Sequence, residues 1–173
     1  IELLSPRQRV EVLSEPNQTD APVPTGCVRD ALLAGLTTGS ARVVAGGVEV
    51  PGTVLVDRSA RLATVLRQHG VGPDTMVGLC LDRSEAMLVG VLGAWQAGGG
   101  YVPLDPAFPP DRLRMMVEDS GLPVIVTCAT ERELAASLAG DGVTVVCLDD
   151  PEVTAATPLS QPVPLHPDNL AYA

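Results

Sequence analysis

The feature that most constrains the fold is a regular alternation of short apolar segments with amphipathic ones. Fully apolar segments occupy residues 75–81, 101–104, 123–128 and 142–148, and segments with apolar residues at helical spacing lie before and between them. Parallel strands that are buried on both faces have continuous apolar runs, and helices connect them. The alternation therefore predicts an α/β fold, a largely parallel sheet flanked by helices.

Local signals mark where these helices begin and end. Ser84 is the expected N-cap of one helix, and Pro110 and Gly121 bracket another. Thr130 and Glu133 have the spacing of a capping box, in which each side chain accepts a hydrogen bond from the other residue's backbone N–H. These signals predict helices that start after residues 84, 109 and 130, and a further one over residues 53–68.

The first 52 residues are less regular. Ser5 and Pro6 favour a short helix over residues 5–13, and residues 28–36 favour a second. Val-rich arms on both sides of Gly46 and Gly47 predict a β-hairpin. The tracts 14–26 and 149–164 are rich in Pro and polar residues, as linkers or arms are.

Charge and composition exclude several function classes. The chain has 11 basic and 21 acidic residues, a formal net charge of −10, which argues against binding to nucleic acid or to an anionic membrane surface. The longest apolar run, residues 87–95, is too short to span a bilayer. The cysteines, at positions 27, 80, 128 and 147, form no C-x-x-C pair, which argues against a metal site. Cys80, Cys128 and Cys147 lie inside apolar runs, so we expect small buried side chains in a reduced, cytoplasmic protein.

Residues with catalytic potential are few, and each has a simpler structural explanation. The glycines at 98–100 follow a helix and precede a strand, the reverse of the order in a phosphate-binding loop, so a helix C-cap and turn are expected. Turns, caps and solvated loops account for the remaining candidates, which are His69, His166, Asp105, Asp111, Asp149, Asp150 and Glu152. The residues therefore predict no catalytic, cofactor-binding or metal site in this chain.

One long segment resembles a known family. Residues 94–121, AWQAGGGYVPLDPAFPPDRLRMMVEDSG, resemble the second core motif of nonribosomal peptide synthetase adenylation domains, L-K-A-G-x-A-Y-V-P-[IL]-D-P, and the helix after it. Trp95, Gln96 and Gly100 depart from that pattern. The matching positions are Ala97, Gly98, Tyr101, Val102, Pro103, Leu104, Asp105, Pro106, Pro109, Arg112, Leu113, Met116, Asp119 and Ser120.

Other segments extend the resemblance over nearly the whole chain. Residues 3–19 resemble the junction between a condensation domain and its adenylation domain, residues 70–99 resemble the G-V-G…R-S segment, and residues 166–172, HPDNLAY, resemble the strand before the third core motif. The first core motif, L-T-Y-x-E-L, is not preserved at residues 50–55. The resemblance implies part of the N-terminal core of an AMP-forming adenylate enzyme.

The resemblance implies three segments. Residues 1–26 are linker-like, 27–148 are a partial adenylation-domain core, and 149–173 are a Pro-rich loop and terminal strand. A complete family domain uses ATP and Mg²⁺ and loads a carrier-protein phosphopantetheine. Residues 169–173 are predicted to begin a strand, and in the family the phosphate loop comes after the strand that residues 166–172 resemble, so the chain is expected to be truncated before that loop.

We therefore expect a non-catalytic structural or docking element, inactive alone, whose partners are neighbouring synthetase domains, especially a condensation domain. Two alternatives stay open. One is part of a split or interrupted active adenylation domain, completed by the remainder of that domain. The other is a free-standing α/β binding module unrelated to synthetases. Amino-acid specificity cannot be deduced from these residues.

Overall fold

The computed structural model describes residues 3–22, 25–45 and 47–173. An α/β body follows a helical N-terminal segment. Within the described residues, the elements are α1 (Pro6–Arg9), the π-helical turn η1 (Val10–Ser14), the 3₁₀ turn η2 (Glu15–Asn17), α2 (Val28–Thr37), β1 (Arg42–Ala45), β2 (Val48–Pro51), α3 (Gly52–Gln68), β3 (Met76–Cys80), α4 (Glu85–Ala97), β4 (Gly100–Pro103), α5 (Pro110–Ser120), β5 (Val124–Thr127), the 3₁₀ turn η3 (Ala129–Glu131), α6 (Arg132–Leu138), β6 (Thr144–Cys147) and α7 (Pro151–Thr154).

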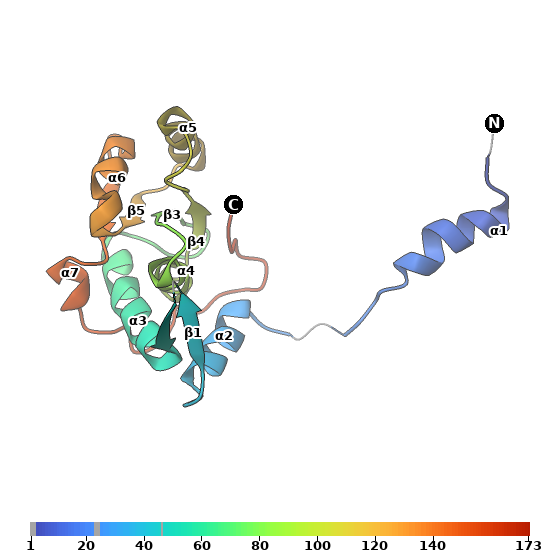
Figure 1. Cartoon of the computed structure of the whole chain (residues 1–173), viewed down its shortest axis with the longest axis horizontal. Coiled ribbons are helices and arrows are strands. Elements are labelled where there is room, and N and C mark those ends of the chain that lie inside the picture. Colours follow the sequence, from blue (N-terminus) through green and yellow to red (C-terminus); the bar gives the residue numbers. More distant parts are fainter. Residues whose placement is uncertain (1–2, 23–24, 46) are drawn as a thin grey trace.

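A four-stranded parallel sheet lies at the centre of the body, with strand order β4-β3-β5-β6. In Figure 1, α5 and α6 lie above the strands, and α3 and α4 lie below them. The chain moves from β3 to β4 through α4 and then returns past β3 to β5 and β6 through α5 and α6. Right-handed crossovers place helices on opposite faces when the direction of progress reverses. The predicted fold class is confirmed.

The core has two apolar layers, one on each face of the sheet. The central strands β3 and β5 are buried on both faces, so their alternate side chains enter different layers. Val77 and Leu79 pack with α3 and α4, whereas Ile125 packs with α5 and α6. Gly78 allows Leu104 to approach β3 closely, because a Cβ at position 78 would lie 2.9 Å from the Leu104 Cδ1.

Most predicted boundaries agree with the structure within two residues. Ser84 caps α4, since its Oγ accepts a hydrogen bond from the Ala86 N–H at 3.3 Å. Gly121 ends α5 in the left-handed conformation. Strands β1 and β2 form the predicted antiparallel hairpin. Of its two turn glycines, Gly47 has φ +80° and Gly46 lies outside the described residues.

The capping box predicted at residues 130–133 is wrong. Residues 129–131 form the 3₁₀ turn η3, and α6 begins only at Arg132. The Thr130 hydroxyl instead lies 3.0 Å from the Cys128 Sγ. The tighter turn shifts the start of the helix, so Thr130 and Glu133 no longer stand at the N-cap and N3 positions.

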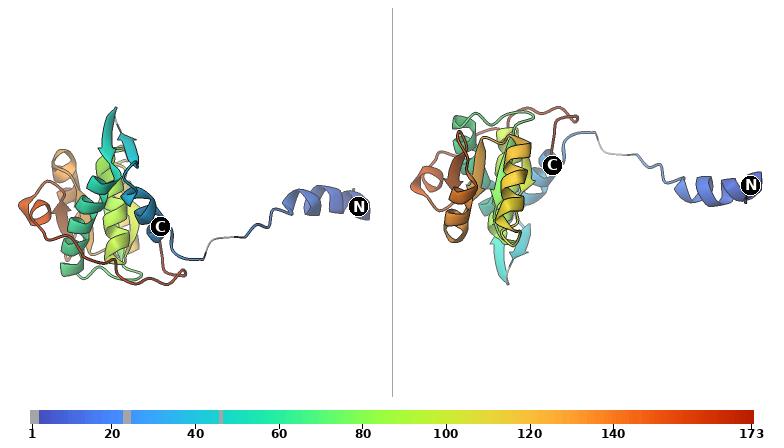
Figure 2. Two further views of the ribbon diagram at one scale, coloured as in Figure 1. Left: turned by 90° about the horizontal axis from the view of Figure 1, so that it is seen from below. Right: turned by 90° about the horizontal axis from the view of Figure 1, so that it is seen from above.

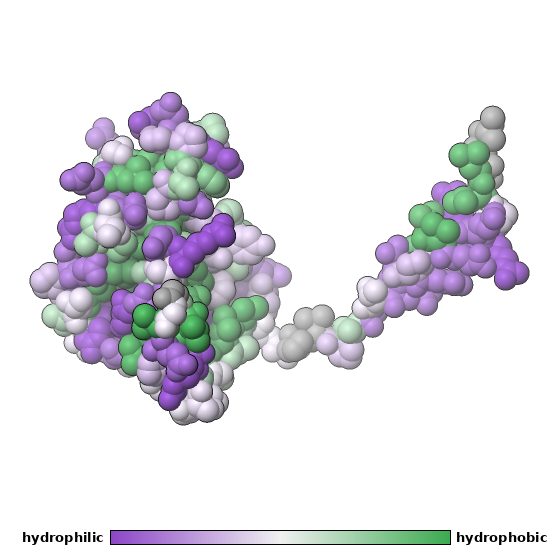
Figure 3. All heavy atoms as spheres, in the orientation of Figure 1, coloured by the Kyte–Doolittle hydropathy of each residue, from purple (hydrophilic) through white to green (hydrophobic). Residues whose placement is uncertain are grey.

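The N-terminal helical segment stands away from the body in both views of Figure 2. Ser5 and Gln8 form a capping box at its start. All of residues 3–22 are exposed. Figure 3 shows hydrophobic side chains gathered along one side of this segment and hydrophilic ones along the other. The exposed apolar side chains are Leu3, Leu4, Val10, Val12 and Leu13.

Candidate functional site

Residues 155–173, which we call the terminal strap, cross α3 and α4 and end beside β4. This segment includes part of the tract expected to be a linker. In the structure α7 precedes it, and successive polar contacts hold it to the body. The expected strand over residues 169–173 is present only as an isolated bridge between Tyr172 and Tyr101. The strap and the groups that hold it are the most developed polar arrangement in the described part of the chain.

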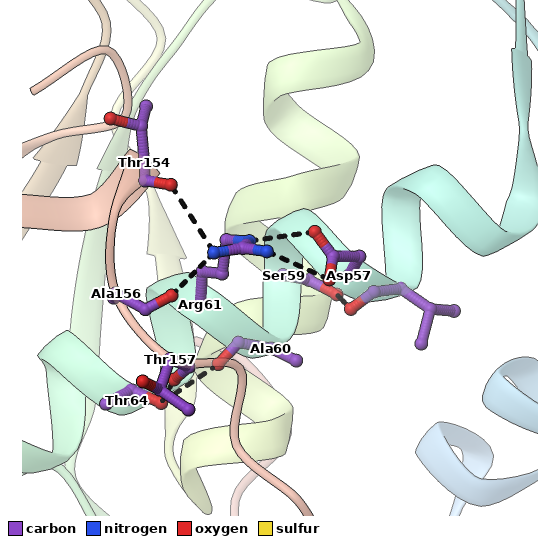
Figure 4. A network of polar contacts seen from close by, with 9 residues as sticks. Asp57, Ser59, Ala60, Arg61, Thr64, Thr154, Ala156 and Thr157 are labelled. Carbon is purple, nitrogen blue, oxygen red and sulfur yellow. Dashed lines mark hydrogen bonds and ion pairs between the residues drawn. The ribbon is translucent and has the colours of Figure 1, made fainter. Parts of the chain in front are cut away.

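The first contacts come from α3 (Figure 4). The Arg61 Nε lies 2.8 Å from the Asp57 Oδ2, and this ion pair orients the guanidinium. The guanidinium then donates a hydrogen bond of 2.7 Å to the Ala156 carbonyl. One turn further along α3, the Thr64 hydroxyl donates to the Thr157 carbonyl at 2.7 Å. Helical residues three or four apart lie on the same face, so Arg61 and Thr64 contact neighbouring strap carbonyls.

The second set of contacts comes from the end of α4 and the start of α2. The Gln96 carbonyl accepts a 3.0 Å hydrogen bond from the Val163 N–H. The Arg29 guanidinium donates to the Val163 carbonyl at 2.5 Å and to the Trp95 carbonyl at 3.3 Å. Arg29 is only 6% exposed, and Asp30 pairs with it at 2.8 Å. A buried guanidinium therefore joins α2, α4 and the strap.

The last contacts place the strap at the outer edge of the sheet. Both carboxylate oxygens of Asp74 accept hydrogen bonds of 2.9 Å, from the Asn169 side-chain amide and from the Leu170 N–H. Tyr101 in β4 donates its N–H to the Ala171 carbonyl at 3.2 Å and accepts from the Ala173 N–H at 3.0 Å. The Trp95 indole also donates to the Ala171 carbonyl, at 2.9 Å.

Two of the three glycines at 98–100, Gly98 and Gly100, lie against the strap, and Gly99 lies against the Thr75 carbonyl oxygen in the turn before β3. Gly98 caps α4 in the left-handed conformation, as predicted. A Cβ at Gly98 would lie 2.9 Å from the Val163 side chain, and a Cβ at Gly100 would lie 3.0 Å from the Leu170 carbonyl oxygen. A C-cap requires only one glycine. The other two allow close approach of backbone segments.

The three departures from the adenylation-domain pattern lie at or beside the strap. Trp95 donates to it, Gln96 accepts from it, and Gly100 lies against it. The Gln96 side chain is buried and donates to the Ser59 Oγ on α3 at 2.6 Å. Sequence reasoning missed Arg29 and Asp74, whose partners in the strap lie more than 90 residues away in the chain. The run of three glycines was the only local sequence signal for this contact region.

The histidine candidates contact acidic neighbours. His69 Nε2 lies 3.4 Å from a Glu152 carboxylate oxygen, which links the end of α3 to α7. His166 Nδ1 lies 3.2 Å from an Asp168 carboxylate oxygen within an exposed turn. The two histidines belong to separate surfaces, and the structure does not bring them together.

The acidic candidates stabilise loops and helix ends. Asp149 accepts from the Ala129 N–H at 2.7 Å, and Asp150 pairs with Arg132 at 2.5 Å. The hydrogen bond from Arg132 lowers the pKa of Asp150 below its ordinary value. Asp105 accepts from the Ala107 N–H at 2.9 Å. Asp111 pairs with Arg114 in the first turn of α5.

Cys80 and Cys147 are buried at strand ends, as predicted, whereas the prediction for Cys128 is wrong, because this residue follows β5 and is only partly buried. Burial raises the pKa of the Cys80 thiol to about 11, with smaller contributions from Glu131 and Cys128. Burial also raises the pKa of Cys147. All four thiols are free, and within the described residues no group of three His, Cys, Asp or Glu side chains is arranged to hold a metal ion.

A hollow of about 620 Å³ lies at the carboxyl ends of β3 and β4. Open parallel sheets commonly bind ligands at this end. Its walls include Met87 and Phe108, and its rim carries Asp82, Arg83 and Asp105. Among the described residues, every buried side-chain nitrogen or oxygen has a hydrogen-bond partner, so no orphaned buried polar side chain marks a ligand site there.

Comparison with known proteins identifies relatives over most of the chain. The family model described as AMP-binding enzyme matches residues 40–173. Bacitracin synthase 3 of Bacillus licheniformis is 38% identical over 135 residues, covering 76% of this chain and 2% of that protein. Tyrocidine synthase 3 of Brevibacillus parabrevis is 48% identical over 79 residues, covering 46% of this chain and 1% of that protein. The chain thus spans only a few per cent of these curated relatives.

Comparison with solved structures identifies the same family. A nonribosomal peptide synthetase, FmoA3, in its alpha-methyl-L-serine-AMP bound form superposes with a TM-score of 0.86 at 28% identity, covering 99% of this chain and 19% of that one. A benzoate CoA ligase from Burkholderia xenovorans LB400 shares the fold, with a TM-score of 0.72 at 19% identity over 83% of this chain and 31% of that one. Among the described residues, no helix has the length and hydrophobicity needed to cross a membrane. The chain belongs to the AMP-binding enzyme family and corresponds to the N-terminal portion of a nonribosomal peptide synthetase adenylation domain.

Proposed function

We propose that this chain is a non-catalytic structural and docking element of a nonribosomal peptide synthetase. One observation carries the proposal: the polar side chains nearest the strap hold backbone in place. Arg29, Arg61, Thr64 and Asp74 each bond to the strap backbone or to a strap side chain. A catalytic site needs polar groups directed at a reacting molecule, and these groups are directed at the chain itself.

Phosphoryl and adenylyl chemistry needs a phosphate cradle and cationic groups near the transferring oxygens. Most arginines of the described body are engaged in other contacts. Arg58 pairs with Glu85 at 2.7 Å, and Arg132 pairs with Asp150. ATP and Mg²⁺, which a complete family domain is expected to use, are therefore not proposed as ligands of this chain alone.

Docking is assigned to the N-terminal helical segment. Val10 is 49% exposed and Leu13 is 52% exposed, on a segment that stands clear of the body. Contiguous exposed apolar side chains are typical of interaction sites. The proposed partner is a neighbouring synthetase domain, in the first instance a condensation domain, because residues 3–19 resemble the junction between such a domain and an adenylation domain.

The catalytic half of the proposal is tested by amino-acid-dependent exchange of pyrophosphate into ATP. We expect exchange by the purified chain to equal the background without protein for every amino acid tried. Exchange above background that depends on one amino acid would refute a non-catalytic role.

The docking half is tested by titrating a condensation domain against the chain and against the double variant Val10→Ser/Leu13→Ser. Weaker binding of the variant supports docking through this segment, and equal binding refutes it.

A second function, one part of a split or interrupted adenylation domain, is favoured by a specific observation. The strap occupies the outer edge of β4 through Tyr101, and its last residues are exposed there. A sheet edge can accept further strands. Pyrophosphate exchange that appears only when the rest of an adenylation domain is supplied as a second chain would establish this function.

A further inference from the structure

We infer that Asp74 is a positioning residue, which sets where the terminal strap meets the edge of β4. The inference rests on the proposed structural role of the chain and names the group that makes the strap part of the sheet. Asp74 lies in the turn before β3, and the strap residues that it holds lie 95 and 96 positions further along the chain.

The backbone at Asp74 is unusual. Asp74 has φ +60° and is the one described residue other than glycine with a positive φ. Most side chains avoid this left-handed region, whereas Asp and Asn are enriched in it. Glycine would adopt the conformation more readily. The turn therefore favours Gly, Asn or Asp, and only a residue with a side chain can reach the strap.

The two hydrogen bonds of Asp74 fix position and register together. One oxygen accepts from the Leu170 backbone, and the other accepts from the Asn169 side chain. Asn169 is itself oriented, because its Oδ1 accepts from the His166 N–H at 2.8 Å and leaves Nδ2 for Asp74. The strap can satisfy all three hydrogen bonds only when residues 169 and 170 lie beside the turn.

This placement is transmitted directly to the sheet edge. Leu170 precedes the segment whose Ala171 carbonyl and Ala173 N–H pair with Tyr101. A strand that slips by one residue would present the opposite side chains and exchange its donors for acceptors. Residues 171–173 are exposed, so burial does little to define their register. Asp74 supplies a side-chain constraint one residue before the pairing begins.

A reciprocal exchange tests this pairing. In Asp74→Asn the amide nitrogen of Asn169 meets a side chain that lacks the second acceptor, and in Asn169→Asp two carboxylates face each other. The double variant Asp74→Asn/Asn169→Asp restores all three hydrogen bonds, and only the one between the two side chains has its donor and acceptor exchanged. Asn also tolerates the left-handed backbone, so the exchange changes only the pairing. Asp119→Asn is the matched control, since Asp119 is an exposed carboxylate on α5.

Two readouts report on the strap. Hydrogen exchange by NMR gives the protection of the Leu170 and Ala173 amides, and the fluorescence of Trp95, the only tryptophan, reports its hydrogen bond to Ala171. Each single variant is expected to lower amide protection by about tenfold, as for loss of a charge-assisted hydrogen bond. We also expect Trp95 emission to shift to longer wavelength in both. The double variant should recover most of both signals, and Asp119→Asn should resemble the parent.

Single variants that keep parental protection would overturn the inference. So would a double variant that recovers nothing, because the effects would then not arise from the contact between these two residues. If the Asp74 variants fail to fold, Asn169→Ala tests the same contact, because it removes the side-chain hydrogen bond to Asp74 and leaves the turn at Asp74 unchanged. Parental protection in that variant would likewise overturn the inference. None of these readouts uses adenylation, so detected pyrophosphate exchange would refute the proposed function and leave this inference standing.

Discussion

Replacing Gly93 with alanine should destabilise the body, although alanine is the better helix former. Gly93 lies on α4 where it meets α3. An alanine Cβ at this position would lie 2.5 Å from Cδ2, 2.9 Å from Cγ and 3.1 Å from Cβ of Leu62. Leu62 is fully buried, and its own Cβ is among the crowded atoms. A rotamer change would move Cδ2 and Cγ but would leave the Cβ contact at 3.1 Å, and the buried Leu62 has no open space to enter, so the two helices must separate.

The size of the effect follows from two opposing terms. Alanine in place of glycine stabilises a helix interior by about 1 kcal/mol. Overpacking of a well-packed core costs about 1–3 kcal/mol, and the upper part of that range applies because several atoms of Leu62 are involved. We expect a net loss of about 1–2 kcal/mol in the free energy of unfolding. Both helices also hold the strap, through Arg61 and Gln96, so separation should loosen it.

Urea unfolding followed by circular dichroism measures the effect. Gly35→Ala is the matched control, because a Cβ at Gly35 on α2 would have no atom within 4 Å. The control should gain about 0.5–1 kcal/mol from the same exchange of residues. Equal m-values would show that the unfolded states remain comparable. If Gly93→Ala is as stable as Gly35→Ala, the reasoning about the contact between α3 and α4 is refuted.

Three further outcomes are expected. Gly100→Ala should push the strap from β4, because the new Cβ would lie 3.0 Å from the Leu170 carbonyl oxygen, and hydrogen exchange at residue 173 should accelerate. The hydrogen bond from Arg132 lowers the pKa of Asp150 in the folded state. The contribution of Asp150 to stability is therefore present above its unfolded pKa and disappears as the pH falls through its folded pKa. In urea unfolding, the free energies of unfolding of Asp150→Asn and of the unmodified chain should become equal at low pH. The Cys80 thiol, with its pKa raised to about 11, should resist iodoacetamide at about pH 8 until urea unfolds the chain, as mass spectrometry of the alkylated protein would show.

The parallel sheet could be predicted because its determinants are local. Each strand is a short apolar run and each helix has its own start and stop signals, such as Ser84 and Gly121. The order β4-β3-β5-β6 was not predicted, because the handedness of a crossover fixes the face that its helix covers only once the order of the strands is known. The start of α6 could not be placed, because a 3₁₀ turn and a capping box both fit the residues at 130–133.

The terminal strand was expected, but the path of the strap over α3 and α4 could not be predicted, because the residues that hold the strap are far apart in the sequence. Nothing near Arg61 or Arg29 distinguishes them from surface arginines, and their acceptors are backbone carbonyls, which have no sequence signature. Asp74 is equally inconspicuous, since aspartate is common in turns. The glycine run was the local signal, because a helix end requires one glycine and Gly100 is a further glycine that lies against the strap.

Backbone pairing alone cannot explain the position of the strap. Its backbone pairing with the sheet is a single bridge at Tyr101, and Pro103, two residues further along β4, has no N–H to contribute. The remaining contacts come from α2, α3, α4 and the turn at Asp74, which lie on different parts of the body. Because α3 and α4 both hold the strap, a change in the packing of these two helices should also move the strap. Gly93→Ala should consequently weaken the pairing of the strap with Tyr101 at the edge of the sheet, although Gly93 is not in β4.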